Sequence, residues 1–291
     1  MRRVIGSVMV SAAAVLLGIA GAGCGAANTV DPVAKAATIS NQAPGLRMNL
    51  QMRLSTPALP TPLLVTGSGS FDTPQRSGSF GISMDLSSIP QAAQVLGASS
   101  LQLQEVIDGT TIYLKLPPAL ARSFPAHGKT WIKIDLARAS QSLGVSGLSS
   151  LLNNPSSTDP SQFLRYLRAE SGGVTRIGTA QVDGFNTTEY RARIDLSKVG
   201  AVLSAAERAQ AGRTVAQLEQ LTHLRYVPVK VWVDGQHLVR RLALSFDETV
   251  SGQSLAADMQ IDFPQYGPQP PPQLPPPSEV ADLSGQLPAA G

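Results

Sequence analysis

The stretch at residues 46–54 reads LRMNLQMRL, and it decides the fold class. Its apolar residues occupy every second position and are separated by arginine, asparagine and glutamine. This period of two is typical of a β-strand that buries one face and exposes the other. The same alternation predicts further strands at residues 63–71, 80–86 and 101–107. The chain is therefore expected to build a β-sheet with one apolar face.

Three Asp-Gly pairs stand between such strand-like runs, at residues 108–109, 183–184 and 234–235. Asp-Gly suits the type I′ turn, in which both central residues have positive φ. Each pair therefore predicts a β-hairpin, and the series predicts an antiparallel meander. The last hairpin is expected to join residues 229–233 to 238–246, with a closing strand at 255–263.

Helices are expected where the period of two gives way to a helical period. Three strand-like runs end in an aspartate followed by leucine, at Asp85, Asp135 and Asp195. Each aspartate can accept hydrogen bonds from free amides at the start of a helix. Helices are predicted at residues 88–96, 137–152 and 198–221, and a short one opened by Asp31 and Pro32.

A further helix is predicted to open at Asp159-Pro160. It carries Phe163, Leu164 and Leu167 on one face, because residues three and four apart share a side of a helix. The apolar faces of these helices need a partner surface, and the apolar face of the sheet is the large one available.

The N-terminal segment is typical of an export signal. Arg2 and Arg3 precede an uncharged run that ends in small residues before Cys24, the single cysteine. This order predicts a signal peptide at residues 1–23 and a lipidated tether at 24–32, with diacylglycerol on Cys24. Gly21 departs from the aliphatic residue usual three positions before such a cysteine. An uncleaved membrane anchor and a secreted protein with a free thiol are the alternatives.

The C-terminal segment, residues 264–291, holds nine of the 22 prolines. Proline lacks the amide hydrogen that a sheet requires, so a disordered tail in extended polyproline II conformation is predicted. The tail is either a solvated end or a contact for a partner protein. The folded domain is predicted to cover residues 33–263.

Composition and motifs exclude several classes of function. Without Arg2 and Arg3 the chain has 21 basic against 20 acidic residues, so nucleic acid is not an expected partner. No nucleophile elbow, zinc-binding helix, phosphate loop or dinucleotide fingerprint occurs. The three histidines stand far apart in the sequence. We therefore expect no enzyme activity, no cofactor and no metal site.

The lipobox-like Cys24, the Asp-Gly hairpins, the intervening helices and the late segment PVKVWVDG at residues 228–235 together resemble a known family. They are similar to the LppX/LprG-like lipoproteins of actinobacterial envelopes, which share a fold with the carriers LolA and LolB. The resemblance covers about residues 30–263. It implies an α+β fold, a half-open antiparallel β-barrel of about eleven strands with helices covering its concave face.

The resemblance also implies a function, which is the binding of acyl chains of glycolipids or lipoproteins in an apolar cavity between the sheet and the helices. The sequence then predicts a lipid carrier anchored through Cys24 to the extracytoplasmic face of the cell membrane. Candidate cavity-lining residues are Phe80, Ile82, Met84, Phe163, Leu164 and Leu167. The alternative is a non-catalytic lipoprotein of the same fold that binds another envelope protein as a sensor or scaffold.

Overall fold

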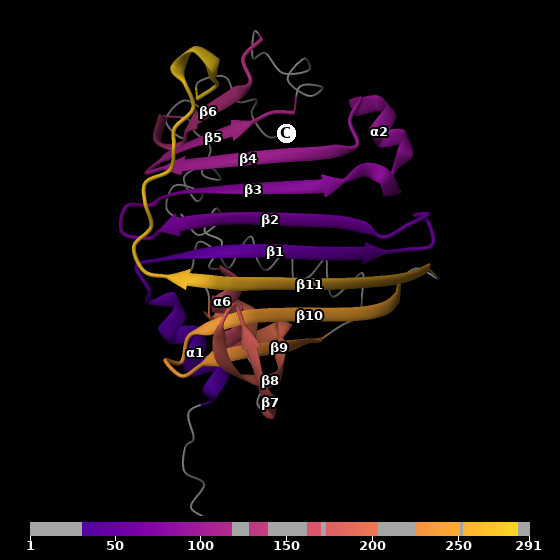
Figure 1. The fold of residues 1–291 in the computed structure, drawn as a ribbon, viewed down its shortest axis with the longest axis vertical. Helices are drawn as coiled ribbons and strands as arrows, with labels where there is room; N and C mark the ends of the chain where they lie inside the picture. The colour runs from indigo at the N-terminus through magenta and orange to yellow at the C-terminus, as the bar shows by residue number, and fades with distance from the viewer. Residues whose placement is uncertain are drawn as a thin grey trace, which may run out of the picture.

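The computed structural model describes residues 31–117, 128–138, 162–169, 173–202, 225–250 and 253–284. Twelve strands form one sheet in the order β12-β6-β5-β4-β3-β2-β1-β11-β10-β9-β8-β7 (Figure 1). The strands are β1 Gly45–Ser55, β2 Leu63–Asp72, β3 Ser77–Asp85, β4 Ser100–Asp108, β5 Thr111–Lys115, β6 Trp131–Asp135, β7 Thr175–Val182, β8 Phe185–Asp195, β9 Tyr226–Asp234, β10 Val239–Val250, β11 Gln253–Tyr266 and β12 Val280–Asp282. The described helices are α1 Pro32–Asn41, α2 Pro90–Leu96, α6 Gln162–Tyr166 and α7 Leu196–Val199, with short 3₁₀ turns η1 Leu86–Ser88, η3 Leu167–Ala169, η4 Gly200–Val202 and η5 Pro277–Glu279.

The antiparallel meander is confirmed, because every neighbouring pair of strands except β12 and β6 is antiparallel. The alternating stretch at residues 46–54 lies within β1, which pairs with β2 on one side and β11 on the other. The sheet is open, because its end strands β12 and β7 do not pair with each other. The half-open arrangement is therefore as predicted, with a twelfth strand from the C-terminal segment.

The Asp-Gly pairs all lie in hairpins, but only one forms the predicted turn. Asp183 and Gly184 both have positive φ, as type I′ requires. In the β4–β5 hairpin the central residues are Gly109 and Thr110, and of these only Gly109 has positive φ. In the β9–β10 hairpin the positive φ falls on His237. Strand register, not the dipeptide, sets the turn in those two hairpins.

The aspartates at the strand ends cap helical turns as predicted. Asp85 accepts a hydrogen bond from the amide of Ser87 at 2.9 Å, and Asp195 accepts one from Ser197 at 3.1 Å. Asp135 accepts from the amides of Ala137 and Arg138 at 2.9 and 3.2 Å. The amide hydrogen bond from Ser87 lowers the pKa of Asp85, and hydrogen bonds from the Ser197 hydroxyl and then its amide lower the pKa of Asp195. Most of residues 137–152 and 198–221 lie outside the described residues.

The packed core lies between one half of the sheet and helices α1 and α6. From α1, Val33, Ala36 and Ala37 are fully buried, and from the α6–η3 turn Leu164 and Leu167 are fully buried. They pack against the inner face, which is the face of the sheet that bears α1, on strands β8, β9, β10, β11 and β1. Helix α1 is also held to β10 by a hydrogen bond from the amide of Val239 to Ser40 Oγ, 2.9 Å long. Helix α2 buries none of its residues, so it covers no part of this core.

The C-terminal segment, residues 267–284, corrects the prediction of a disordered tail beginning at residue 264. In Figure 1 this yellow segment leaves β11, runs past the ends of β1 to β5, and reaches β6. The amide of Gly267 donates to Gly45 O at 2.9 Å, and the amide of Gln269 donates to Asp72 Oδ2 at 3.0 Å. Strand β12 then pairs in parallel with β6.

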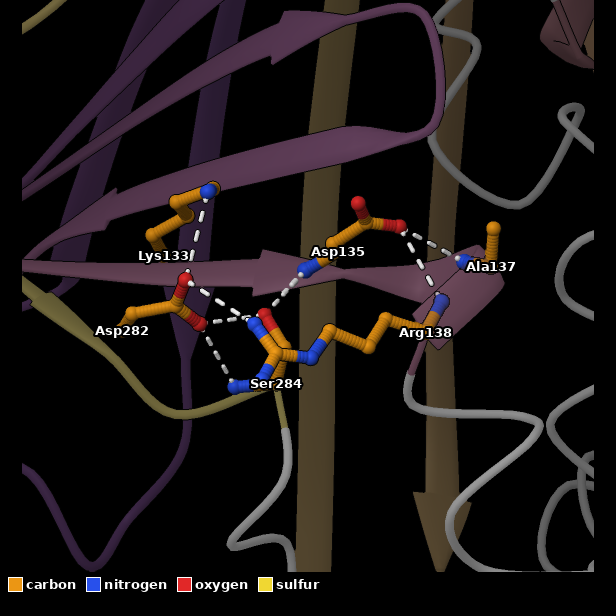
Figure 2. Close-up of polar contacts among 6 residues, drawn as sticks. All are labelled: Lys133, Asp135, Ala137, Arg138, Asp282 and Ser284. Atoms are coloured by element: carbon orange, nitrogen blue, oxygen red, sulfur yellow. Dashed lines mark hydrogen bonds and ion pairs between the residues drawn. The ribbon is translucent and has the colours of Figure 1, made fainter.

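Side chains reinforce this pairing (Figure 2). Ser284 Oγ accepts a hydrogen bond from the amide of Asp135 at 2.9 Å, and Lys133 Nζ lies 3.2 Å from Asp282 Oδ2. Hydrogen bonds from Ser284, and then from Lys133, lower the pKa of Asp282 to about 2. Leu283 is 7% exposed. Proline is compatible with this docking because the prolines precede β12, and the residues that form the ladder are Val280, Ala281 and Asp282.

Candidate ligand-binding face

The inner face of the sheet continues beyond the packed core onto β3, β4 and β5. Side chains alternate along each strand, so register identifies its members. Ile82 pairs with Gly67 and Leu103, and Met84 pairs with Val65 and Leu101. Leu101, Ile82 and Met84 are half-buried, and Leu103 is 42% exposed. An apolar surface therefore lies beside the packed core without being fully buried.

The candidate residues divide between these two regions. Phe80, Ile82 and Met84 lie on the inner face of β3, and Phe80 packs at the margin of the core. Leu164 and Leu167 lie inside the packed core, against α1. Both side chains are fully buried there, and their role in lining a cavity stays a prediction. The side chain of Phe163 and all of Cys24 lie outside the described residues.

Phe80 lies across two glycines of the neighbouring strand. A Cβ atom on Gly69 would stand 2.5 Å from Phe80 Cδ2, and one on Gly67 would stand 3.0 Å from Phe80 Cζ. The register between β2 and β3 is unbroken here, so these glycines mark a close approach and not a bulge. The ring thus lies flat on the inner face, which keeps that surface smooth and apolar.

One carboxyl group interrupts this apolar surface. Glu105 pairs with Phe80 on β3 and with Leu114 on β5, so its side chain lies on the inner face. Burial raises the pKa of the Glu105 carboxyl above its ordinary value. It makes no hydrogen bond or ion pair with the rest of the described chain. The sequence analysis missed Glu105, although the alternation of Leu101, Leu103 and Ile107 places it on the apolar side.

A buried ion pair between Arg240 and Asp234 stabilises the fold outside this surface. Arg240 Nε donates to Asp234 Oδ2 at 2.7 Å, and its guanidinium lies 3.6 Å from the centroid of the Phe185 ring. The other oxygen of Asp234 accepts from the amides of Gln236 and Leu238, both at 2.9 Å. This pair therefore shapes the β9–β10 turn.

Within the described residues, no three His, Cys, Asp or Glu side chains come together in a way that would hold a metal ion. None of the helices in those ranges has both the length and the apolar character to cross a bilayer. His127 and His223 lie outside the described residues, and His237 is exposed in a turn.

Comparison with known proteins gives likenesses of fold. No family model and no curated protein matches the sequence. Among solved structures, LprF from Mycobacterium bovis is 11% identical with a TM-score of 0.43, over 83% of this chain and 94% of that one. The lipoprotein LppX from Mycobacterium tuberculosis is 12% identical with a TM-score of 0.39, over 81% and 93%. The MucA/MucB complex of Pseudomonas aeruginosa gives 9% identity and a TM-score of 0.29, over 84% and 58%. LppX, which the sequence-based resemblance names, is thus among the solved structures to which this chain is similar.

Proposed function

We propose that this protein is a non-catalytic envelope lipoprotein, anchored through Cys24, that binds acyl chains or amphiphilic lipids on the inner face of β3 and β4. The apolar surface formed by Phe80, Ile82, Leu101 and Leu103 is the binding surface. Lipid carriage or transfer at the extracytoplasmic face of the membrane is the role that such binding would serve.

One observation supports this proposal above the others. The inner face changes from a filled core to an incompletely buried apolar surface within the same sheet, and Leu103 is 42% exposed there. Exposed apolar area is unfavourable in water by roughly 25 cal/mol per Å², so a surface of this kind favours an apolar ligand. Acyl chains fit such a surface because they need no hydrogen-bonding partners.

Crosslinking to a photoactivatable palmitic-acid analogue tests the proposal on the full chain in membranes. The Leu103→Asp variant puts a charge on the binding surface, so its crosslinking yield should fall about tenfold while its melting temperature stays close to that of the parent. Ile177→Asp is the matched control, because Ile177 is also 42% exposed but lies on edge strand β7. Its yield should equal that of the parent.

Peptide mapping should place the crosslinks on β3 and β4. Equal crosslinking of the parent and Leu103→Asp would contradict the proposed site. No crosslinking of the parent, together with no lipid in solvent extracts of the purified protein, would favour a protein-binding lipoprotein instead.

A further inference from the structure

The outer face of the sheet, opposite α1, contains a hollow of about 1090 Å³ over β1, β2, β3 and β4. Its position follows from strand register. On β2 the lining run begins at Thr66 and ends at Ser70, and on β3 it begins at Ser79 and ends at Ser83. All four residues point away from the inner face, because their neighbours Gly67 and Ile82 belong to it. Ligand sites commonly measure about 300–1,000 Å³, so the hollow has the size of a binding site.

Short side chains form the floor of the hollow and long ones form its walls. Ser68, Ser79 and Ser83 stand on the floor beside Gly81. A Cβ atom on Gly81 would meet nothing closer than 3.9 Å, so the floor is open at its centre. The hollow therefore arises from the difference in length between serine or glycine and the amide side chains on either side.

Primary amides line the hollow on β1 and β4, and Leu96, Leu116 and Pro117 also border it. Asn49 and Gln51 stand on β1, and Gln102 and Gln104 stand on β4. None of these four side chains makes a hydrogen bond to another part of the described chain, and neither do the floor serines. Amides and hydroxyls both donate and accept, so they match a ligand whose groups also do both.

The charged side chains that line the hollow are all positive. Arg47 and Lys115 line it, and no Asp or Glu does. Arg47 has no acidic partner in the described chain, and Lys115 lies over the ring of Trp131 at 5.6 Å. Elsewhere on the outer face several cations are paired: Arg241 with Asp262, Lys230 with Glu189, and Lys133 with Asp282. The hollow therefore carries two cations and no carboxylate, which favours an anionic ligand.

We propose that the outer hollow binds an anionic, polyhydroxylated chain, that is, a glycan carrying carboxylate or phosphate groups. Hydroxyl groups of the glycan would pair with the amides and serines, and its negative groups with Arg47 and Lys115. An acidic peptide fits less well, because the outward-facing lining has no aromatic or methionine side chain to anchor one. The hollow and the acyl-binding surface share strands β3 and β4, so Phe80, Ile82, Leu101 and Leu103 also border the hollow, but their side chains project from the opposite face of the sheet.

Isothermal titration of the full-length protein in detergent micelles tests this site with a linear hexamer of galacturonic acid. A neutral glucose hexamer is the comparison for charge, and oligoglutamate is the comparison for an acidic peptide. The galacturonate hexamer should bind at least tenfold more tightly than either of these, and added salt should weaken it.

Two pairs of variants locate the site. Gly81→Leu fills the open floor, and its matched control is Gly178→Leu, a strand glycine on β7 that also has open space around its Cβ position. Arg47→Gln removes a cation from the hollow, and Arg53→Gln removes one from the same strand and face outside it. Gly81→Leu should weaken binding at least tenfold and Arg47→Gln several-fold, while both controls stay within twofold of the parent.

Several outcomes would overturn the proposal. They are an absence of binding of both the galacturonate hexamer and phosphate-bearing glucose oligomers at millimolar concentration, equal binding of the neutral hexamer, or unchanged binding by a folded Gly81→Leu variant. Tighter binding of oligoglutamate would assign the hollow to an acidic peptide. Phosphate-bearing glucose oligomers then distinguish the source of the charge, since binding of these but not of galacturonate assigns a phosphorylated glycan.

Discussion

Glu105 places one ionisable carboxyl group on an otherwise apolar surface. It stands on the apolar inner face between Phe80 and Leu114, and its carboxyl makes no ion pair or hydrogen bond with the described residues. Its pKa is raised because burial disfavours the charged form. Because the pKa of Glu105 is higher in the folded than in the unfolded protein, protonation of this carboxyl favours folding, and its contribution to the free energy of unfolding is fully present at low pH. That stability is lost as pH rises through the folded-state pKa.

Replacement of Glu105 by glutamine should therefore stabilise the protein at pH 8 and have little effect near pH 4. Urea unfolding at both pH values measures this difference in the free energy of unfolding. Asp108→Asn is the control, because Asp108 ends the same strand and its side chain is exposed to water. A stabilisation by Glu105→Gln of equal size at both pH values would show that ionisation of Glu105 is not its cause.

At the scale of elements, the C-terminal segment completes the sheet. It adds β12 beside β6, where Val280 pairs with Trp131. Leu283 is 7% exposed and Trp131 is 6% exposed. Each buried apolar side chain of this size stabilises a fold by about 1.5–3 kcal/mol. The segment therefore acts as part of the domain.

Truncation after Gly267 should lower the free energy of unfolding by about 2 kcal/mol or more, because it removes β12 and Leu283 from the fold. The emission of Trp131 should shift to longer wavelength as the ring becomes exposed. A finer pair of variants is Ser284→Ala, which removes the hydrogen bond to the amide of Asp135, and Ser278→Ala on the exposed turn before β12. The first should cost about 1 kcal/mol and the second nothing measurable. Unchanged stability and emission after truncation would refute the docking.

At the scale of the whole molecule, the proposed anchor would hold both faces of the sheet close to the membrane. Lipid chains on Cys24 would supply about 0.8 kcal/mol of membrane affinity per buried methylene group. With Cys24 at the membrane and an acyl-binding inner face, the outer hollow remains a surface for soluble or polymeric envelope material.

The variant Cys24→Ala tests this anchor in the native membrane. We expect the protein to leave the detergent-rich phase on phase partitioning, or to remain unprocessed, and to lose labelling by fatty-acid precursors. Ser7→Ala, a change of similar size within the same leader, should leave both measurements unaltered. Parent-like partitioning and labelling of the cysteine variant would refute lipidation at this residue.

Much of the fold could be predicted from local sequence because its signals act over a few residues. Alternation at residues 46–54 predicts β1, and Asp85, Asp135 and Asp195 cap helical turns as their positions indicate. Turn types were less predictable, since strand register moved the positive φ from Asp-Gly to His237 in the β9–β10 hairpin.

The features that sequence alone did not determine depend on residues brought together from far apart. Ser284 meets Asp135 across 149 positions, so the composition of the proline-rich segment could not indicate that it pairs with β6. The outer hollow likewise exists because β1 and β4 place long amides on either side of short residues from β2 and β3. The sequence by itself determined the strands, their apolar face and the helix caps, because hydrophobic period and hydrogen bonding to nearby amides are local. Only the tertiary structure decided the twelfth strand, the division of the inner face into filled and half-buried parts, and the hollow, because these depend on packing between distant segments.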